Sequence, residues 1–352
     1  MSALCIHFGK CGGCSVQDMA PAEYRALKRD IVVRALARHG VEAEISQAVE
    51  VPPGTRRRCV FKIAKSGGEA AIGFHARATH DIVDMHACRV LTPALVALVP
   101  RLRAIMTEVL RDGDGVEARI TQTDSGFDLL LRWKKPAAPG LVAQLAAWAE
   151  RSGVARIASN NDVLVEFAAP ALRIGEVQIR LPPGAFMQPT REGEIFLQDK
   201  AAEALSKAKS AVDLFAGCGT FSLALARRMK VHAVELDGAQ LAALGSAARG
   251  ATGQKPVTTE KRDLFKRPLG VRELAPFDAA ILDPPRAGAA AQVAELAKSG
   301  LRRIVYVSCN ADSFARDARV LMGEGYKIGN VTPVDQFLWS EHIELVACFT
   351  RD

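Results

Sequence analysis

One stretch decides the fold of this chain: Asp213-Leu214-Phe215-Ala216-Gly217-Cys218-Gly219-Thr220-Phe221, which follows an apolar run and opens an Ala- and Leu-rich segment. This order predicts a strand, a glycine turn and a helix. Glycines in such a turn let the backbone approach a ligand closely, and the helix N-terminus presents oriented N–H groups. Many α/β folds turn in this way, so the residues that follow must identify the ligand.

Two acidic residues downstream narrow the choice of ligand. Glu235 ends the strand-like run Val231–Glu235, the next such run after the glycine turn, and this position suits a pair of ribose hydroxyls. Asp263 follows Lys261-Arg262, where it suits the adenine end of a nucleoside. The full G-x-G-x-x-G pattern of dinucleotide sites is absent. The pattern therefore favours S-adenosylmethionine, and a structural acid at a strand end is the alternative for Glu235.

The pattern of apolar residues changes after Leu181-Pro182-Pro183-Gly184. Beyond this point strand-like runs alternate with Ala-rich helical stretches, which predicts a doubly wound parallel sheet. The runs are Ala211–Phe215, Val231–Glu235, Ala279–Leu282 and Arg303–Ser308. We therefore predict an α/β fold over residues 186–352, a Rossmann-like class I S-adenosylmethionine-dependent methyltransferase domain.

Residues 1–185 show a different pattern, in which short apolar runs alternate with Gly, Pro and Asp turns. The apolar runs are Val60–Ile63, Phe127–Leu131 and Val163–Phe167, and the helical candidates are Leu95–Val109 and Leu141–Arg151. This pattern predicts an N-terminal α+β domain with an antiparallel sheet. A further helix is expected over residues 21–39, and this helix can pack on the catalytic domain.

The composition excludes several classes of protein. The 352 residues are 49% apolar, but no apolar run is long enough to cross a bilayer, so no membrane span is expected. No secretory signal precedes Cys5, which predicts a cytoplasmic protein. The net charge is +7, of which residues 1–185 carry +5 and residues 186–352 carry +2. Basic residues are densest at Arg56-Arg57-Arg58 and Lys134-Lys135. This positive charge predicts a polyanionic partner, with an ordinary solvated surface as the alternative.

Cys309 ends the apolar run Arg303–Ser308. Ligands bind at the carboxyl ends of strands in open α/β sheets, so beside a methyl-donor site this thiol predicts a nucleophile and methylation of carbon. The preceding strand ends in Asp283-Pro284-Pro285-Arg286-Ala287-Gly288. Enzymes that methylate amino groups usually have an aromatic residue after such a motif, whereas Arg286 suits an anion or a uracil carbonyl. A small core residue is the alternative for Cys309.

Five segments carry a family resemblance: Phe186-Met187-Gln188, Asp213 to Phe221, Asp283 to Gly288, Ser308-Cys309-Asn310 and His342-Ile343-Glu344. In this order they resemble the RNA uracil-C5 methyltransferase family, which makes 5-methyluridine in ribosomal and transfer RNA. The resemblance implies methylation of a uridine in structured RNA, 23S ribosomal RNA more than transfer RNA. One alternative is RNA cytosine-C5 methylation, which the lack of a cysteine beside Pro284 disfavours. Another is a non-catalytic iron–sulfur RNA-binding factor, which the presence of Cys309 and Glu344 disfavours.

The resemblance also implies roles for single residues. Cys309 is expected to attack C6 of the base, and Glu344 to remove the C5 proton, with a buried structural acid as the alternative for Glu344. Asn310 or Arg286 can stabilise the developing oxygen charge. Relatives often carry Asn at the position of Thr220. The expected contacts to S-adenosylmethionine are Gln188, Phe215, Thr220, Glu235, Asp263 and Asp283.

The remaining motif is a cysteine cluster. Cys5, Cys11 and Cys14 have the spacing C-x5-C-x2-C, and Cys88 follows much later in the chain. Eight cysteines in a reducing compartment are more often metal ligands or nucleophiles than disulfides, and this spacing suits either zinc or a [4Fe–4S] cluster. The resemblance favours [4Fe–4S], in the iron–sulfur branch without the extra N-terminal β-barrel of some relatives, and we expect its role to be structural.

Overall fold

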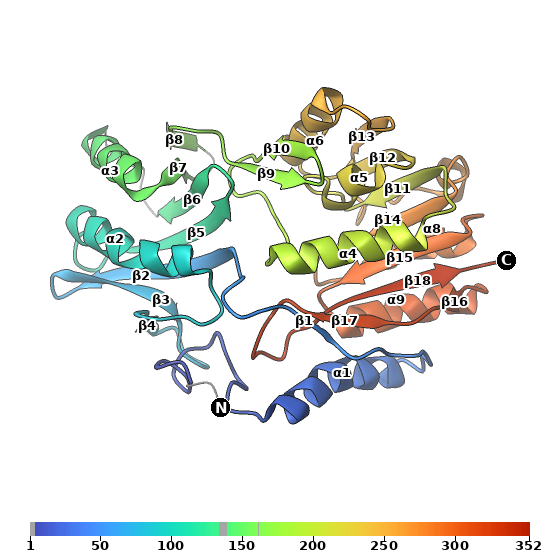
Figure 1. The fold of residues 1–352 in the computed structure, drawn as a ribbon, viewed down its shortest axis with the longest axis horizontal. Coiled ribbons are helices and arrows are strands. Elements are labelled where there is room, and N and C mark those ends of the chain that lie inside the picture. Colours follow the sequence, from blue (N-terminus) through green and yellow to red (C-terminus); the bar gives the residue numbers. More distant parts are fainter. Residues whose placement is uncertain (1–3, 134–138, 161) are drawn as a thin grey trace.

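Two β-sheets lie side by side in this chain (Figure 1). The computed structural model describes residues 4–133, 139–160 and 162–352. A seven-stranded sheet is built from residues before Phe167, and a nine-stranded sheet from residues at both ends of the chain. Among the described residues, no helix is long and apolar enough to cross a membrane.

The nine-stranded sheet has a parallel centre and an antiparallel edge. In pairing order its strands are β1 (Val49–Glu50), β17 (Thr332–Asp335), β18 (Glu344–Thr350), β15 (Arg303–Ser308), β14 (Ala279–Leu282), β11 (Ser210–Leu214), β12 (Lys230–Glu235) and β13 (Val257–Lys261), with β16 (Lys327–Ile328) also paired to β18. The four predicted strands are confirmed as β11, β12, β14 and β15, all parallel. The predicted doubly wound parallel sheet is thus found at these strands, and the structure adds an antiparallel edge, where β18 runs antiparallel to both β15 and β17.

The order of these strands positions a ligand site. The chain runs from β11 outward through β12 and β13 and then crosses back to β14 on the other side of β11, so the strand order reverses between β11 and β14. In open α/β sheets such a switch point creates a crevice at the carboxyl ends of the strands. Every candidate donor residue except Gln188 follows or ends one of these strands, so the crevice is where they meet.

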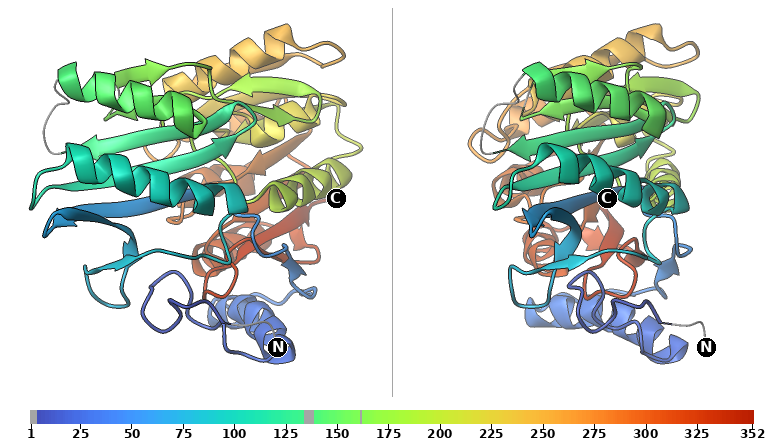
Figure 2. Two further views of the ribbon diagram at one scale, coloured as in Figure 1. Left: turned by 60° about the vertical axis from the view of Figure 1, so that its left-hand side comes forward. Right: turned by 90° about the vertical axis from the view of Figure 1, so that its left-hand side faces the viewer.

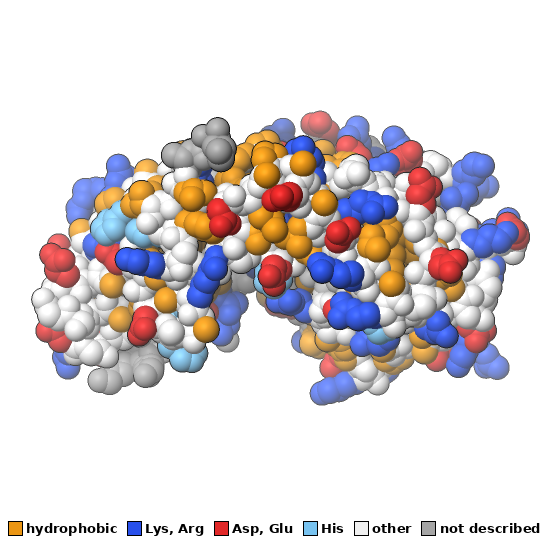
Figure 3. Space-filling model, turned by 90° about the horizontal axis from the view of Figure 1, so that it is seen from below, with side chains coloured by type: hydrophobic (Ala, Val, Ile, Leu, Met, Phe, Trp, Pro, Cys, Tyr) orange, Lys and Arg blue, Asp and Glu red, His pale blue; other side chains and the backbone are white. Residues whose placement is uncertain are grey.

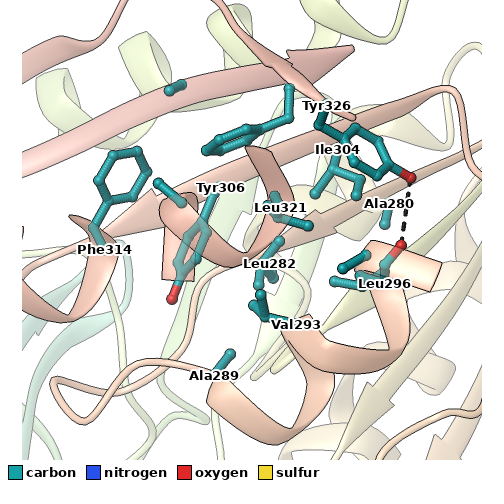
Figure 4. Close-up of a cluster of buried hydrophobic side chains, with 14 of the residues drawn as sticks. Ala280, Leu282, Ala289, Val293, Leu296, Ile304, Tyr306, Phe314, Leu321 and Tyr326 are labelled. Carbon is teal, nitrogen blue, oxygen red and sulfur yellow. Dashed lines mark hydrogen bonds between the residues drawn. The ribbon is translucent and has the colours of Figure 1, made fainter. Parts of the chain in front are cut away.

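Helices cover both faces of this sheet. They are α4 (Arg191–Ala204), α5 (Thr220–Leu225), α6 (Gly238–Gly250), α7 (Val271–Leu274), α8 (Ala290–Lys298) and α9 (Ala311–Gly323). On one face Tyr306 and Phe314 belong to a core that α8 and α9 complete, and the buried hydroxyl of Tyr326 lies 3.4 Å from the carbonyl oxygen of Leu296 (Figure 4) and 2.7 Å from that of Leu301. Tyr306 donates to Asp317 at 2.6 Å, so the buried hydroxyl is satisfied.

The seven-stranded sheet carries two helices on one face (Figure 2). Its pairing order is β4 (Ile82–Asp84), β3 (Glu69–His75), β2 (Arg58–Ser66), β5 (Gly115–Thr123), β6 (Gly126–Trp133), β7 (Val154–Ser159) and β8 (Asp162–Glu166). The helices are α2 (Pro93–Val109) and α3 (Pro139–Ser152). All pairs are antiparallel except β6 with β7, so the predicted antiparallel sheet is confirmed with one exception.

Two early segments join the nine-stranded sheet instead. Helix α1 (Pro21–Arg38) buries Val32, Ala35 and Leu36 in the core around Phe314. β1 then extends the sheet by pairing in parallel with β17. A small ribbon of β9 (Ala171–Ile174) and β10 (Val177–Arg180) likewise packs on α6. Helix α1 and β1 therefore belong to the nine-stranded sheet and the core on it, although they come before the seven-stranded sheet in the chain.

Candidate functional site

The turn after β11 is shaped by backbone that only certain residues adopt. Phe215 takes a left-handed conformation with φ of +63°, as does Gly219 with φ of +89°. A Cβ on Gly219 would lie 2.3 Å from Leu244 Cδ1, so the close approach of α6 also requires glycine there. The turn therefore holds the Phe215 backbone in a sparsely populated conformation at the edge of the crevice.

Glu235 is fixed over this turn by backbone donors. Its Oε2 accepts from the Gly217 N–H at 3.0 Å, and its Oε1 accepts from the N–H groups of Leu236 and Asp237 at 2.7 and 2.9 Å. The carboxylate is half-buried at the end of β12. These bonds orient Glu235 toward the glycine turn. The carboxylate therefore stabilises the turn, and it can also accept hydrogen bonds from a ligand placed there.

Asp263 and Phe215 are the next candidate donor residues along the same edge of the sheet. Asp263 stands two residues after the end of β13, and its Oδ1 accepts from the backbone N–H groups of Phe265 and Lys266. The rings of Phe215 and Phe265 lie 5.4 Å apart. Thr220 opens α5, and its carbonyl oxygen accepts from Gln198 at 2.9 Å. The predicted donor residues of β11, β12 and β13 are thus gathered at one edge of the sheet.

Two carboxyl groups lie at the switch point. Asp213 on β11 is fully buried and accepts from the Ser222 hydroxyl at 2.6 Å, while its Oδ1 has no partner among the described residues. Burial raises the pKa of Asp213 to about 7. Burial, followed by the charge of Asp213, likewise raises the pKa of Asp283 to about 7. A cation placed at this crevice would favour the ionised form of both groups.

Hydrogen bonds between the side-chain amides of Gln336 and Gln188 orient Gln188 toward Asp283. Gln188 Nε2 donates to Asp283 Oδ2 at 2.9 Å, and Gln188 Oε1 accepts from Gln336 Nε2 at 3.0 Å. The Thr190 hydroxyl in turn donates to Gln336 Oε1 at 3.1 Å. Sequence reasoning missed Gln336, because a single glutamine between two strands carries no pattern that marks it as buried.

Cys309 and Glu344 come together from adjacent strands. Cys309 follows β15 and Glu344 opens β18, and the two strands pair with Ser308 opposite Leu345. Glu344 is 3% exposed, and no donor of the described residues reaches its Oε1. Burial, with the charge of Asp283 second, raises the pKa of Glu344 well above its usual value.

The surroundings of Cys309 oppose its ionisation in the free protein. Burial, then the charges of Glu344 and Asp283, raise the pKa of its thiol to about 12, and exposed Arg286 acts in the opposite direction. Asn310 caps helix α9 through its side-chain oxygen and donates to the carbonyl oxygen of Arg286 at 3.1 Å. The site therefore holds a half-buried thiol and a buried carboxyl group next to the donor crevice.

The arginine run 56–58 differs from the predicted basic patch. Arg57 is 7% exposed and forms an ion pair with Glu194 of α4 at 2.6 Å, so its prediction as a surface charge is wrong. Arg58 lies over the exposed ring of Phe186 at 4.4 Å, and burial lowers the pKa of Arg58 to about 10. Lys134 and Lys135 lie outside the described residues.

A hollow between the two halves remains lined by basic side chains (Figure 3). Arg56 is half-buried, with its guanidinium 5.6 Å from the centre of the Phe337 ring, and Arg89 lies 5.8 Å from the centre of the Trp339 ring. These two arginines come from the N-terminal half, and the aromatic rings from the segment before Glu344. The junction between the halves is thus both basic and aromatic beside the candidate catalytic pair.

The four predicted cysteine ligands line one cavity of about 480 Å³. Burial, then the neighbouring thiols of Cys88, Cys11 and Cys5, raise the pKa of Cys14 to about 12. Residues 4–133, 139–160 and 162–352 nevertheless contain no three His, Cys, Asp or Glu side chains in an arrangement that could hold a metal ion as they stand. Four converging thiols are still the donor set that zinc or an iron–sulfur cluster takes.

The fold and the crevice define the class of this protein. A parallel sheet with this switch point, a glycine turn after β11 and acids at the following strand ends form a class I S-adenosylmethionine-dependent methyltransferase. The fold matches the crystal structure of the Pyrococcus abyssi tRNA (uracil-54, C5)-methyltransferase in complex with S-adenosyl-L-homocysteine. That match has a TM-score of 0.76 at 22% identity, over 97% of this chain and 85% of the other.

Sequence comparisons narrow the class to a family. Residues 255–351 match the family model for tRNA (uracil-5-)-methyltransferases. An RNA methyltransferase of Rhizobium meliloti is 41% identical over 99% of this chain and 85% of its own length. The 23S rRNA (uracil(1939)-C(5))-methyltransferase RlmD of Cronobacter sakazakii is 31% identical over 99% of this chain and 82% of its own length. The chain belongs to the RNA uracil-C5 methyltransferase family and is an S-adenosylmethionine-dependent RNA methyltransferase.

Proposed function

We propose that this enzyme methylates C5 of a uridine in 23S ribosomal RNA through a covalent bond between Cys309 and C6 of the base. The observation that carries the proposal is the placement of Cys309, directly after β15, next to Glu344, the first residue of the adjacent strand β18, with Asp283 beside both. A nucleophile and a proton acceptor at one crevice are the two groups that this chemistry needs from the protein.

The reaction begins with loss of the Cys309 thiol proton to solvent, which Arg286 favours by its charge. The thiolate forms a bond to C6 as the C5–C6 double bond opens, and the electrons move to the C4 oxygen as an enolate. C5 then takes a methyl group, and bound S-adenosylmethionine supplies this group in electrophilic form. We assign stabilisation of the oxygen charge to Arg286 and Asn310, which are hydrogen-bonded to each other beside Cys309.

Glu344 completes the reaction. Its carboxylate takes the proton from C5, the C5–C6 double bond re-forms, and the Cys309 thiolate leaves with the electrons of the S–C6 bond. A raised pKa makes the ionised carboxylate a stronger base, and its Oε1, which no donor of the described residues reaches, is an acceptor for the proton. The chemistry therefore needs Cys309 before methyl transfer and Glu344 after it.

The donor contacts follow from the edge of the sheet. We assign the ribose hydroxyls to Glu235 and the adenine end to Asp263, with the Phe215 ring and the Thr220 turn between them. Gln188 and Asp283 lie on the side of the crevice nearest Cys309, so they face the methyl end of the donor.

The choice of 23S ribosomal RNA is supported by the Cronobacter sakazakii relative, whose name specifies a uracil of 23S rRNA. Transfer RNA is the second candidate, because the matching family model describes tRNA methyltransferases. Mapping 5-methyluridine in RNA from cells that lack this gene tests the choice. Loss of one 23S position, with tRNA unchanged, is the expected result, and loss in tRNA alone would contradict it.

The cysteine cavity suits a [4Fe–4S] cluster bound by Cys5, Cys11, Cys14 and Cys88 in a reducing cytoplasm. Supporting this are the four thiols on one cavity and the N–H group of Gly13, which donates to Cys11 Sγ at 3.4 Å. A bound cluster would supply covalent cross-links between residues 5–14 and Cys88, and methyl transfer has no redox step for it to serve. Zinc is the alternative.

A further inference from the structure

A buried charge network in this protein lies outside the donor crevice and the catalytic pair. The Lys28 side chain on α1 is 1% exposed, and its ammonium lies 2.8 Å from Asp335 Oδ1 at the end of β17, a carboxylate with 0% exposure. The Tyr24 hydroxyl, one turn earlier on α1, donates to Asp335 Oδ2. The segment that follows Asp335 is residues 336–343, here called the base loop, and Glu344 comes directly after it.

Lys28 joins the two ends of the base loop. Besides Asp335, its ammonium donates to the carbonyl oxygens of Phe337 at 3.1 Å and His342 at 2.6 Å. An ammonium has three N–H donors, so all of them are used on this loop and its anchor. His342 is two residues before Glu344, and the bond therefore fixes the backbone that leads into Glu344.

The middle of the base loop is held from the same N-terminal segment. Trp339 has a left-handed backbone with φ of +56°, a conformation that a bulky residue keeps only when its surroundings enforce it. Its N–H donates to the Tyr24 hydroxyl at 2.8 Å, and its carbonyl oxygen accepts from Ser15 and Val16 at 2.7 and 3.1 Å. Strained backbone with this many anchors, five residues before Glu344, indicates a loop whose shape matters.

Stability alone is a poor explanation for this network. A buried ion pair loses hydration on both partners, and well-packed apolar residues of similar size are often at least as stabilising. What apolar residues cannot supply is hydrogen bonds to the carbonyl oxygens at both ends of a loop. We propose that Tyr24, Lys28 and Asp335 are positioning residues that hold the base loop so that Glu344 meets the C5 proton of the methylated base.

This inference rests on the proposed role of Glu344 as the base, and the experiment must separate the two. RNA with 5-fluorouridine at the target position stops the reaction after methyl transfer, because fluorine cannot leave as a proton. The rate of adduct formation on this RNA reports Cys309 attack and methyl transfer. Turnover on ordinary RNA reports these steps together with proton removal.

The test variant is Lys28→Met with Asp335→Asn, which removes the pair without leaving one charge buried alone. We expect adduct formation within about threefold of wild type, turnover lower by about 10- to 100-fold, an unchanged KM for S-adenosylmethionine, and accumulation of the methylated covalent intermediate. The matched control is Arg25→Met with Glu50→Gln, which removes an exposed ion pair between the same helix and β1 and should leave both rates unchanged.

Three variants decide whether Tyr24, Lys28 and Asp335 position Glu344. Wild-type turnover in the Lys28/Asp335 variant, or an equal fall in adduct formation and turnover, would overturn the positioning role, since a loss of folded protein lowers both rates alike. Tyr24→Phe keeps the ring and removes the hydroxyl, and it should show the same split to a smaller degree if the folding of the double variant is impaired. If Glu344→Gln resolves its adduct at the wild-type rate, the proposed base itself is wrong, and this inference falls with it.

Discussion

Cys309 directly follows the last residue of β15, Ser308, which pairs with Leu345, the neighbour of Glu344 on β18. The proposed nucleophile and base are therefore brought together at the end of one β-ladder. Residues next to a ladder are held more rigidly than residues in the middle of a loop, and catalytic geometry depends on small errors in position. The two groups also interact by charge, since Glu344 raises the pKa of the Cys309 thiol.

Replacement of Cys309 by Ala should abolish methylation while donor affinity stays within about threefold of wild type. In the proposed mechanism the thiol forms the bond to the base, whereas the proposed donor residues are Gln188 and residues at the ends of β11 to β14. Titration calorimetry with S-adenosylmethionine and a methylation assay measure the two effects. Cys348→Ala, a half-buried cysteine on β18, is the matched control and should remain active. Appreciable turnover by Cys309→Ala would remove the thiol from the mechanism.

Adduct formation with 5-fluorouridine RNA should accelerate with pH. A thiol pKa of about 12 keeps Cys309 protonated at neutral pH, so the thiolate fraction rises about tenfold per pH unit well below that value. Between about pH 7 and 9 the single-turnover rate should follow this slope. Glu344→Gln should raise the rate only at pH values where Glu344 is ionised, because there the variant removes a negative charge that raises the thiol pKa. A flat profile would contradict proton loss from Cys309 as the activating step.

Gly193→Ala should weaken donor binding from a distance. Alanine favours a helix over glycine, but a Cβ at this position of α4 would lie 2.4 Å from Gln336 Cδ. Displaced Gln336 can no longer donate to Gln188, which in turn orients toward Asp283. A buried hydrogen bond lost in this way costs about 1–3 kcal/mol, or roughly five- to 150-fold in affinity.

Gly245→Ala in α6 is the control for this substitution, because there the new Cβ meets only the mobile end of Arg249 and the methyl group of Thr259. Its donor affinity should match wild type when both are measured by calorimetry. Equal affinities for Gly193→Ala and wild type would show that the amide chain does not support the donor.

The parallel strands, and the place of the candidate donor residues at their ends, could be predicted from the sequence because each leaves a local signal. A strand buried on both faces, such as β11 or β15, is a mostly apolar run, and a candidate ligand residue such as Glu235 ends one. Lys28 and Asp335 leave no such signal, since they lie near opposite ends of the chain and each resembles a surface charge. The prediction for Arg57 fails for the same reason, because only the packed structure shows its burial against Glu194.

Arg57→Met should act on stability rather than on RNA affinity. It would leave Glu194 buried without its cation, and breaking a buried pair costs about 3–5 kcal/mol. Urea unfolding should show a lower midpoint, and Arg57→Met with Glu194→Leu should recover most of the loss. The salt dependence of RNA binding should stay the same, because a phosphate contact at Arg57 would be needed to change its slope. A flatter slope with unchanged stability would show instead that Arg57 contacts an RNA phosphate.

The cysteine cavity gives the last prediction. Anaerobically purified protein should be brown and contain about four irons per chain, as thiolate-bound [4Fe–4S] clusters require. Ser replacement of Cys5, Cys11, Cys14 or Cys88 should remove the iron, whereas Cys59→Ser, at a fifth and buried cysteine that lines the same cavity, should keep it. Donor binding should survive iron loss, because the donor residues belong to the other sheet.

Methylation should still fall when the iron is lost, because the backbone of Ser15 and Val16, next to Cys14, is bonded to Trp339 of the base loop. A loosened cysteine segment would release one anchor of the loop that leads into Glu344, so turnover should fall more than adduct formation on 5-fluorouridine RNA. Stoichiometric zinc in anaerobic protein, without iron or visible absorbance, would overturn the cluster and leave the methyltransferase mechanism intact. Full turnover by an iron-free Cys14→Ser variant would show that the cysteine segment does not support the loop.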